Sequence, residues 1–154
     1  MRRLGLLLAA LLVAAGLTTV APAPAAQAAP SRAALTYERQ AHSSTNYKRK
    51  HFDRRPLTRS SCLNRMARAQ AARMARRQQL FHQDLGNVQR QCGMGWVGEN
   101  LAYGYPNGRA VVRAWMGSRG HRANILNRNF RQEGLGAVKR GGRWYVAQVF
   151  GTPS

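Results

Sequence analysis

The spacing of hydrophobic and polar residues divides the chain into a helical first part and a strand-rich last part. The clearest helical pattern follows Ser60 and Ser61, either of which can cap the first turn. Small and apolar side chains then recur at helical spacing, at Leu63, Met66, Ala67, Gln70, Ala71, Met74 and Ala75. The segment is therefore predicted to be a helix whose Met and Ala stripe lies in the core.

The segments around this helix have weaker patterns. Residues 33–50 are predicted to form a first helix, although apolar residues are sparse in it. Residues 51–60 connect the two helices, and Pro56 prevents a continuous helix through the connection. Residues 80–97 are rich in turn-forming residues and are expected to be irregular.

A third helix is predicted after the turn at residues 106–108. It is amphipathic, with apolar residues at helical spacing: Val111, Val112, Trp115 and Met116. Residues 117–120 interrupt it, and a short helix is expected to begin at His121.

The end of the chain is predicted to be a β-hairpin. Residues 135–140 and 143–151 flank Gly141 and Gly142, a two-residue turn of the kind that suits type I′. Apolar residues alternate in the last strand, which indicates one packed face and a second face that is covered in part. With a further strand over residues 96–104, the pattern predicts an α+β fold with helices packed on the sheet.

The first 28 residues are predicted to be a secretion signal peptide. A short positive start at Arg2 and Arg3 precedes an uncharged apolar run, and small residues suited to a signal peptidase lead up to Ala28. The alternative, a membrane anchor, is less favoured because the run from Leu4 to Val20 is at the lower limit of a membrane span. The mature chain is therefore expected to be secreted, with no transmembrane segment of its own.

The remaining chain is strongly basic. Without Arg2 and Arg3, 23 basic and 5 acidic residues remain, a formal charge of +18. Such a charge attracts polyanions, including anionic lipid and acidic wall polymers. However, 22 of the 25 basic residues are Arg, a bias that a GC-rich coding sequence also produces. The basic residues are dispersed and no nucleic-acid-binding motif accompanies them, so a nucleic-acid partner is not expected.

Cys62 and Cys92 are the two cysteines of the chain, and we expect them to form a disulfide. Pairing is the default in an exported protein with an even number of cysteines. The bridge would tie the start of the second helix to the irregular segment that follows it.

Three rare side chains could meet in one cleft: His82, Glu99 and His121. Two imidazoles and one carboxylate suit a metal such as zinc in an open, three-ligand site. They also suit a hydrogen-bond network that holds loops over the sheet without an ion, which is the interpretation we favour. The residues alone leave both interpretations open.

Several motifs resemble those of the CAP superfamily, which includes cysteine-rich secretory proteins, venom antigen 5 and plant pathogenesis-related proteins. They are HxD at His82, GENLAYG at Gly98, WMGSRGHRANIL at Trp115 and YVAQVFG at Tyr145, and Thr45 begins a TNxxR signature. The resemblance is to the bacterial SCP-like branch. It implies a three-layer α-β-α sandwich with a central antiparallel sheet over residues 37–151, after a short segment at 29–36.

The resemblance also implies a cleft lined by two histidines and two glutamates. His82, Glu99 and His121 are similar to three of these residues, and Ser118 stands where the second glutamate is expected. The missing carboxylate weakens any mechanism that needs two.

The function expected from the resemblance is a binding module acting outside the cell, with lipid, sterol or an anionic wall polymer as candidate ligands. One alternative is a metal-dependent hydrolase using His82, His121 and Glu99, with zinc as the candidate metal. A second alternative is adhesion to anionic wall or lipid through the basic charge alone.

Overall fold

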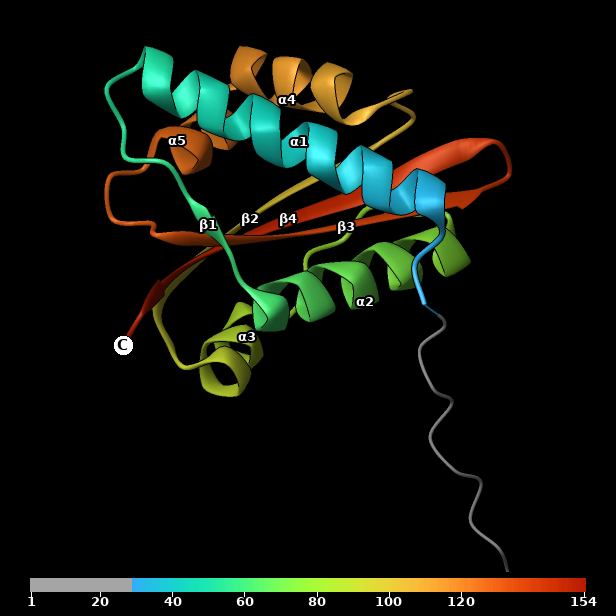
Figure 1. The fold of residues 1–154 in the computed structure, drawn as a ribbon. Coiled ribbons are helices and arrows are strands. Elements are labelled where there is room, and N and C mark those ends of the chain that lie inside the picture. The colour runs from blue at the N-terminus through green and yellow to red at the C-terminus, as the bar shows by residue number, and fades with distance from the viewer. Residues whose placement is uncertain (1–28) are drawn as a thin grey trace, which may run out of the picture.

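The computed structural model describes residues 29–154, so the predicted signal peptide lies outside the described residues. Five helices and four strands follow one another along the chain (Figure 1). The helices are α1 (Arg32–His51), α2 (Ser61–Arg77), α3 (Leu85–Cys92), α4 (Gly108–Gly117) and α5 (Arg119–Leu126). The strands are β1 (Thr58–Arg59), β2 (Met94–Tyr103), β3 (Gln132–Arg140) and β4 (Arg143–Pro153). None of these helices is long and apolar enough to cross a membrane.

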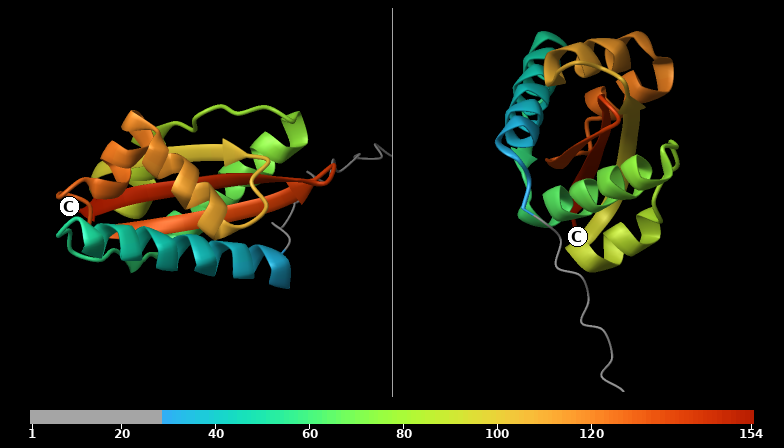
Figure 2. Two further views of the ribbon diagram at one scale, coloured as in Figure 1. Left: turned by 90° about the horizontal axis from the view of Figure 1, so that it is seen from above. Right: turned by 90° about the vertical axis from the view of Figure 1, so that its right-hand side faces the viewer.

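The elements form three layers, as predicted. Helices α1, α4 and α5 cover one face of the sheet, and α2 and α3 cover the other (Figures 1 and 2). The strand order is β1-β3-β4-β2. The three long strands are antiparallel, and the short β1 adds a parallel pair at the edge beside β3. The connector at residues 51–60 therefore contributes two residues to the sheet, which its sequence pattern did not predict.

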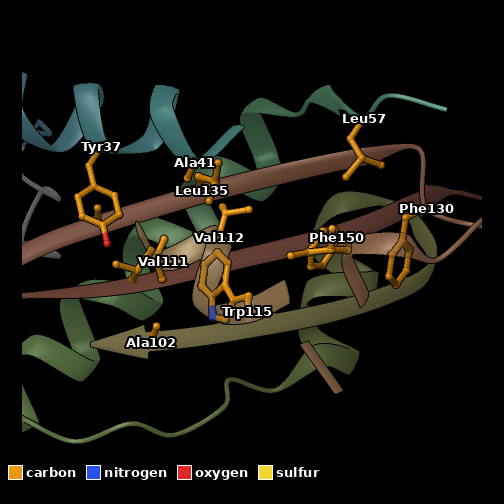
Figure 3. Close-up of a cluster of buried hydrophobic side chains, with 13 residues drawn as sticks. Tyr37, Ala41, Leu57, Ala102, Val111, Val112, Trp115, Phe130, Leu135 and Phe150 are labelled. Carbon is orange, nitrogen blue, oxygen red and sulfur yellow. The ribbon is translucent and has the colours of Figure 1, made fainter. Parts of the chain in front are cut away.

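Both faces of β4 are fully covered, whereas the alternation in the sequence predicted partial cover of one. Val146 and Phe150 face the cluster under α1 and α4, together with Trp115 (Figure 3). Ala147 and Val149 face the cluster under α2. A strand in the middle of a three-layer fold has no solvent side, so its alternation separates two cores instead of core and surface.

Helix α2 packs close to β3 because two residues of that strand are glycines. A Cβ atom at Gly134 would collide with the backbone of Leu63, and one at Gly136 with the backbone of Ala67. Bare backbone at both positions lets the small-residue face of α2 lie directly on the sheet. The predicted cap is also present, since the Ser60 side chain accepts a hydrogen bond from the Leu63 amide.

Helix α3 lies within the segment that was expected to be irregular, so that expectation was wrong. Asp84 caps the helix by accepting a hydrogen bond from the Asn87 amide, and Gly93 ends it in the left-handed region. Val88 is its one fully buried residue. An eight-residue helix with one buried side chain is too short and too polar to produce a clear periodicity.

The disulfide between Cys62 and Cys92 is confirmed, with an S–S distance of 2.04 Å. It joins the first turn of α2 to the last residue of α3 across a sequence separation of 30. The bridge therefore closes the segment that carries His82.

Candidate functional site

A pocket of about 490 Å³ lies at the β2 side of the sheet and is lined by all four predicted cleft residues. Glu99 is provided by β2, and His82 by the loop between α2 and α3. Ser118 precedes the first residue of α5, and His121 lies in the first turn of that helix. The fold thus brings together side chains from the α2–α3 loop, from β2, from the junction of α4 and α5, and from α5 itself.

Glu99 provides a buried carboxylate whose two oxygens are both engaged within the protein. The side chain of Gln83 donates to Oε1 at 2.6 Å, and His82 Nδ1 lies 2.7 Å from Oε2. The Gln83 amide adds a longer contact of 3.4 Å to the same Oε2. Burial raises the pKa of the Glu99 carboxyl, and the hydrogen bonds from Gln83 and His82 oppose that rise.

His82 lies between the buried Glu99 carboxylate and the solvent. Its side chain is 65% exposed, whereas the Glu99 side chain is fully buried. A ring nitrogen that donates to a buried carboxylate fixes the orientation of the imidazole. The other nitrogen, Nε2, is then presented to the pocket and to water.

His121 has a different environment. Its Nδ1 atom is buried and has no hydrogen-bond partner among the described residues. Burial lowers the pKa of the His121 imidazole, and the charge of His82 lowers it further. His121 is therefore favoured as a neutral ring, with Nδ1 enclosed by the protein.

Two asparagines hold the segments of the site together. Asn100 donates to the carbonyl oxygen of His121 at 3.1 Å. Asn124 donates to the carbonyl oxygen of Glu99 at 3.1 Å and to Asn100 Oδ1 at 3.0 Å. These bonds attach the first turn of α5 to β2 and so fix His121 relative to Glu99.

The same polar row continues through the sheet to a second His–Glu pair. Asn100 also donates to Gln148, and Gln148 donates to Glu133 at 2.6 Å. Glu133 Oε1 lies 2.6 Å from His42 Nδ1 on α1. All of the acceptors in this row have donors, as buried polar groups require.

Sequence reasoning did not identify Gln83, Asn124 or Asn100 as part of the site. Gln83 follows His82 directly, so its place in the HxD motif was the available signal. Asn100 follows Glu99 and Asn124 follows His121 by one helical turn, but amide side chains have no distinctive spacing that marks a site. Their roles depend on contacts between distant segments.

The residues of this cleft do not fit zinc as a three-ligand site. In the described part of the chain, no three His, Cys, Asp or Glu side chains are arranged to hold a metal ion. His82 has the carboxylate partner that a metal-bound imidazole needs, since its Nδ1 lies beside Glu99. Binding through His121 Nε2 would instead place a proton on Nδ1, which has no acceptor.

Comparisons with known proteins agree with this architecture. The model of the cysteine-rich secretory protein family, CAP, matches residues 42–150. The uncharacterized protein YkwD of Bacillus subtilis (strain 168) is 35% identical over 115 residues, which are 70% of this chain and 45% of that protein.

Two solved structures share the fold. An extracellular protein containing an SCP domain from Bacillus anthracis str. Ames has a TM-score of 0.71 at 24% identity, over 77% of this chain and 41% of that one. A cysteine-rich secretory protein from Staphylococcus aureus subsp. aureus Mu50 has a TM-score of 0.67 at 21% identity, over 79% and 40%. The chain spans less than half the length of these relatives.

Proposed function

This chain belongs to the cysteine-rich secretory protein (CAP) family, and from that premise we propose that it is an extracellular binding module. Its cleft holds a small ligand through the imidazoles of His82 and His121. One observation carries the proposal: both Glu99 oxygens are engaged within the protein, whereas the two Nε2 atoms have no partner among the described residues. A few convergent polar groups that are free to bond are what a small-molecule pocket offers its ligand.

The extracellular location rests on two observations. Residues 1–28 have the composition of a signal peptide. The disulfide between Cys62 and Cys92 suits an oxidising compartment outside the cytoplasm.

The two imidazoles have different roles in this proposal. The ring of His82 is oriented by Glu99 and carries positive charge when protonated. The ring of His121 is neutral, and its proton lies on Nε2 because a buried N–H at Nδ1 would lack an acceptor. His121 Nε2 therefore offers the ligand an N–H donor, and His82 Nε2 offers a second one only when its ring is protonated, because Nδ1 already donates to Glu99. The ligand end that enters the cleft beside His121 is accordingly a hydrogen-bond acceptor.

Metal-dependent hydrolysis has less support. Glu99 would have to release His82 or Gln83 before it could act as a general base or as a metal ligand. The position of a second carboxylate is occupied by Ser118. A hydroxyl there does not replace a base.

The binding proposal is tested by recording the imidazole nitrogen resonances of the protein while acceptor-bearing probes are added. The probes are acetate, acetamide, N-acetylglucosamine and phosphate. At least one probe is expected to shift the resonances of both His82 and His121, whereas the resonances of His51, which lines neither pocket, should not move. The proposal fails if no probe shifts the resonances of His82 and His121.

A second candidate function is adhesion to anionic polymers, and the ion pairs favour it. Of the five acidic side chains, Glu38 pairs with Arg68, Glu133 lies beside His42 and Glu99 beside His82. These three carboxylates each already face a partner, and even with all five acidic residues counted the chain after the predicted signal peptide has a formal charge of +18. The basic surface is therefore largely uncompensated, and polyanion binding would not need the cleft.

A further inference from the structure

A second, smaller pocket adjoins the cleft. Its volume is about 270 Å³, and it shares two lining residues, Ser118 and His121, with the polar pocket. Its other lining residues are mostly aromatic or aliphatic, among them Leu80, Tyr103, Tyr105 and Trp115. The two pockets therefore adjoin at Ser118 and His121, and the larger one is the more polar in its lining.

Most of the large hydrophobic side chains that are exposed in the described residues lie around the smaller pocket. Five large hydrophobic side chains are exposed in the described residues, and Leu80, Tyr103 and Tyr105 are three of them. All three line this pocket. Scattered exposed hydrophobic residues need no explanation, but a group around one pocket marks a binding surface.

We propose that this side pocket holds the ring of a small aromatic carboxylate, whose carboxylate end accepts hydrogen bonds from His121 and Ser118. The inference rests on the proposed binding function of the cleft and names the class of its ligand. The geometry requires that the ring and the carboxylate be joined by a short linker, because the two shared residues lie where the pockets meet.

The aromatic class follows from the shape and lining of the pocket. An apolar cavity of about 150 Å³ accepts benzene, so a pocket of 270 Å³ accommodates a phenyl or indole ring. Trp115 and the two tyrosines can contact such a ring edge-to-face or in an offset stack. Trp115 is itself buried, and its N–H donates to the Leu101 carbonyl, so its indole forms a fixed wall of the pocket with no free polar group.

The anionic end follows from the donors and charges around the polar pocket. The Ser118 side chain caps no amide of α5, so its hydroxyl is free to donate. The nearest carboxylate, Glu99, already accepts from His82 and Gln83, and Arg73 contacts Gln83 from behind at 3.4 Å. The formal charge of the chain after the predicted signal peptide is +18, which favours an anion over a cation.

The test is a titration of the folded protein with phenylacetate, followed by imidazole NMR shifts and by tryptophan fluorescence. Acetate lacks the ring, phenylacetamide lacks the charge, and hexanoate replaces the ring by a flexible chain. Phenylacetate is expected to bind roughly tenfold more tightly than each of these three probes. Equal binding of hexanoate would overturn the aromatic class, and equal binding of phenylacetamide would overturn the carboxylate.

Two variants locate the ring. Leu80→Ser and Tyr103→Ser are each expected to weaken phenylacetate binding roughly fivefold or more, while acetate binding is unchanged. Tyr47→Ser is the matched control, since Tyr47 is 68% exposed and lines neither pocket. Leu80 lies in a loop, so its variant tests the inference even if Tyr103→Ser disturbs the sheet.

The outcomes separate this inference from the binding function. If acetate shifts the imidazoles but phenylacetate binds no more tightly, the side pocket is not a ring site and the cleft proposal stands. If neither probe shifts them and the other acceptor probes also fail, the cleft proposal itself is wrong. Equal loss of binding in Tyr47→Ser would also overturn the side-pocket assignment.

Discussion

The Nδ1 atom of His82 lies 2.7 Å from the Oε2 atom of Glu99, so an exposed imidazole is held by a fully buried carboxylate. Holding the ring in one orientation costs side-chain entropy, and a charge-assisted hydrogen bond can offset that cost. Gln83 occupies the other carboxylate oxygen at 2.6 Å. Glu99 therefore fixes the positions of His82 and Gln83, and in the proposed function the side chains around it, not Glu99 itself, bind the ligand.

Replacing Glu99 by Gln should lower both stability and probe binding. A carboxamide has one acceptor oxygen, whereas His82 and Gln83 both donate to the carboxylate. In the variant one of these donors is left without an acceptor, which lowers the free energy of unfolding. The variant also no longer buries a charge, which offsets part of this loss, so the net cost should be about 1 kcal/mol. Urea unfolding and imidazole shifts measure the two changes. Asp53→Asn, at an exposed carboxylate, is the control and should change neither.

Acidification should destabilise the protein partly through His121. The pKa of the folded His121 is below its ordinary value of about 6.5, so the unfolded chain takes up the proton first. The contribution of His121 to the free energy of unfolding is therefore fully present above about pH 6.5, and it is lost as the pH falls toward the lower pKa of the folded state. The Glu99 carboxyl acts in the opposite direction, since its raised pKa favours the folded state at low pH.

To isolate the effect of His121, the free energy of unfolding is measured for the wild type and for His121→Gln between pH 7 and pH 5. Wild type should lose more stability than the variant over this interval. Parallel curves would contradict the prediction, as would an NMR titration that places the His121 pKa above about 6.5.

Removing the disulfide should lower stability by about 3–4 kcal/mol in the chain-entropy model. The bridge spans a sequence separation of 30 and closes the segment that carries His82. The measurement is urea unfolding of the Cys62→Ser, Cys92→Ser double variant against the oxidised protein. Reductant should destabilise the oxidised protein and leave the variant unchanged. Two free thiols in secreted protein would show that the bridge does not form.

Salt should separate adhesion from binding in the cleft. Association of the protein with dextran sulfate through dispersed arginines is expected to weaken by on the order of tenfold or more between 50 and 200 mM salt. Acetate or phenylacetate binding in the cleft should change much less, because each of these probes carries a single charge. Glu99→Gln should affect the second interaction and leave the first intact. Salt-resistant binding of dextran sulfate would argue against simple charge attraction.

The parts of the fold that were predictable from sequence are those with a strong local signal. The Met and Ala stripe of α2 and the two-glycine turn of the hairpin are examples, and Gly141 and Gly142 have the positive φ angles of 55° and 75° that type I′ requires. The cysteine pair was predictable from count and compartment. The family motifs supplied the layer order, which periodicity alone does not give.

The remaining features depend on contacts between distant residues. The His42–Glu133 pair joins positions 91 residues apart and has no local signature. Likewise, the enclosed Nδ1 of His121 follows from how α5 packs against the sheet. The sequence therefore favoured a hydrogen-bond network but could not exclude a metal-binding site. Helix α3 was missed because one buried valine makes no pattern.

The tautomer of His121 decides whether the cleft offers a ligand an N–H donor at Nε2, and a long-range ¹H–¹⁵N spectrum of the imidazoles at neutral pH measures it. We expect a neutral His121 with an unprotonated Nδ1 and a protonated Nε2. Acetate or phenylacetate should shift Nε2, whereas stoichiometric zinc should not saturate both rings. A protonated Nδ1 on His121, or saturation of both His82 and His121 by one equivalent of zinc, would show that the cleft does not bind a ligand in this way.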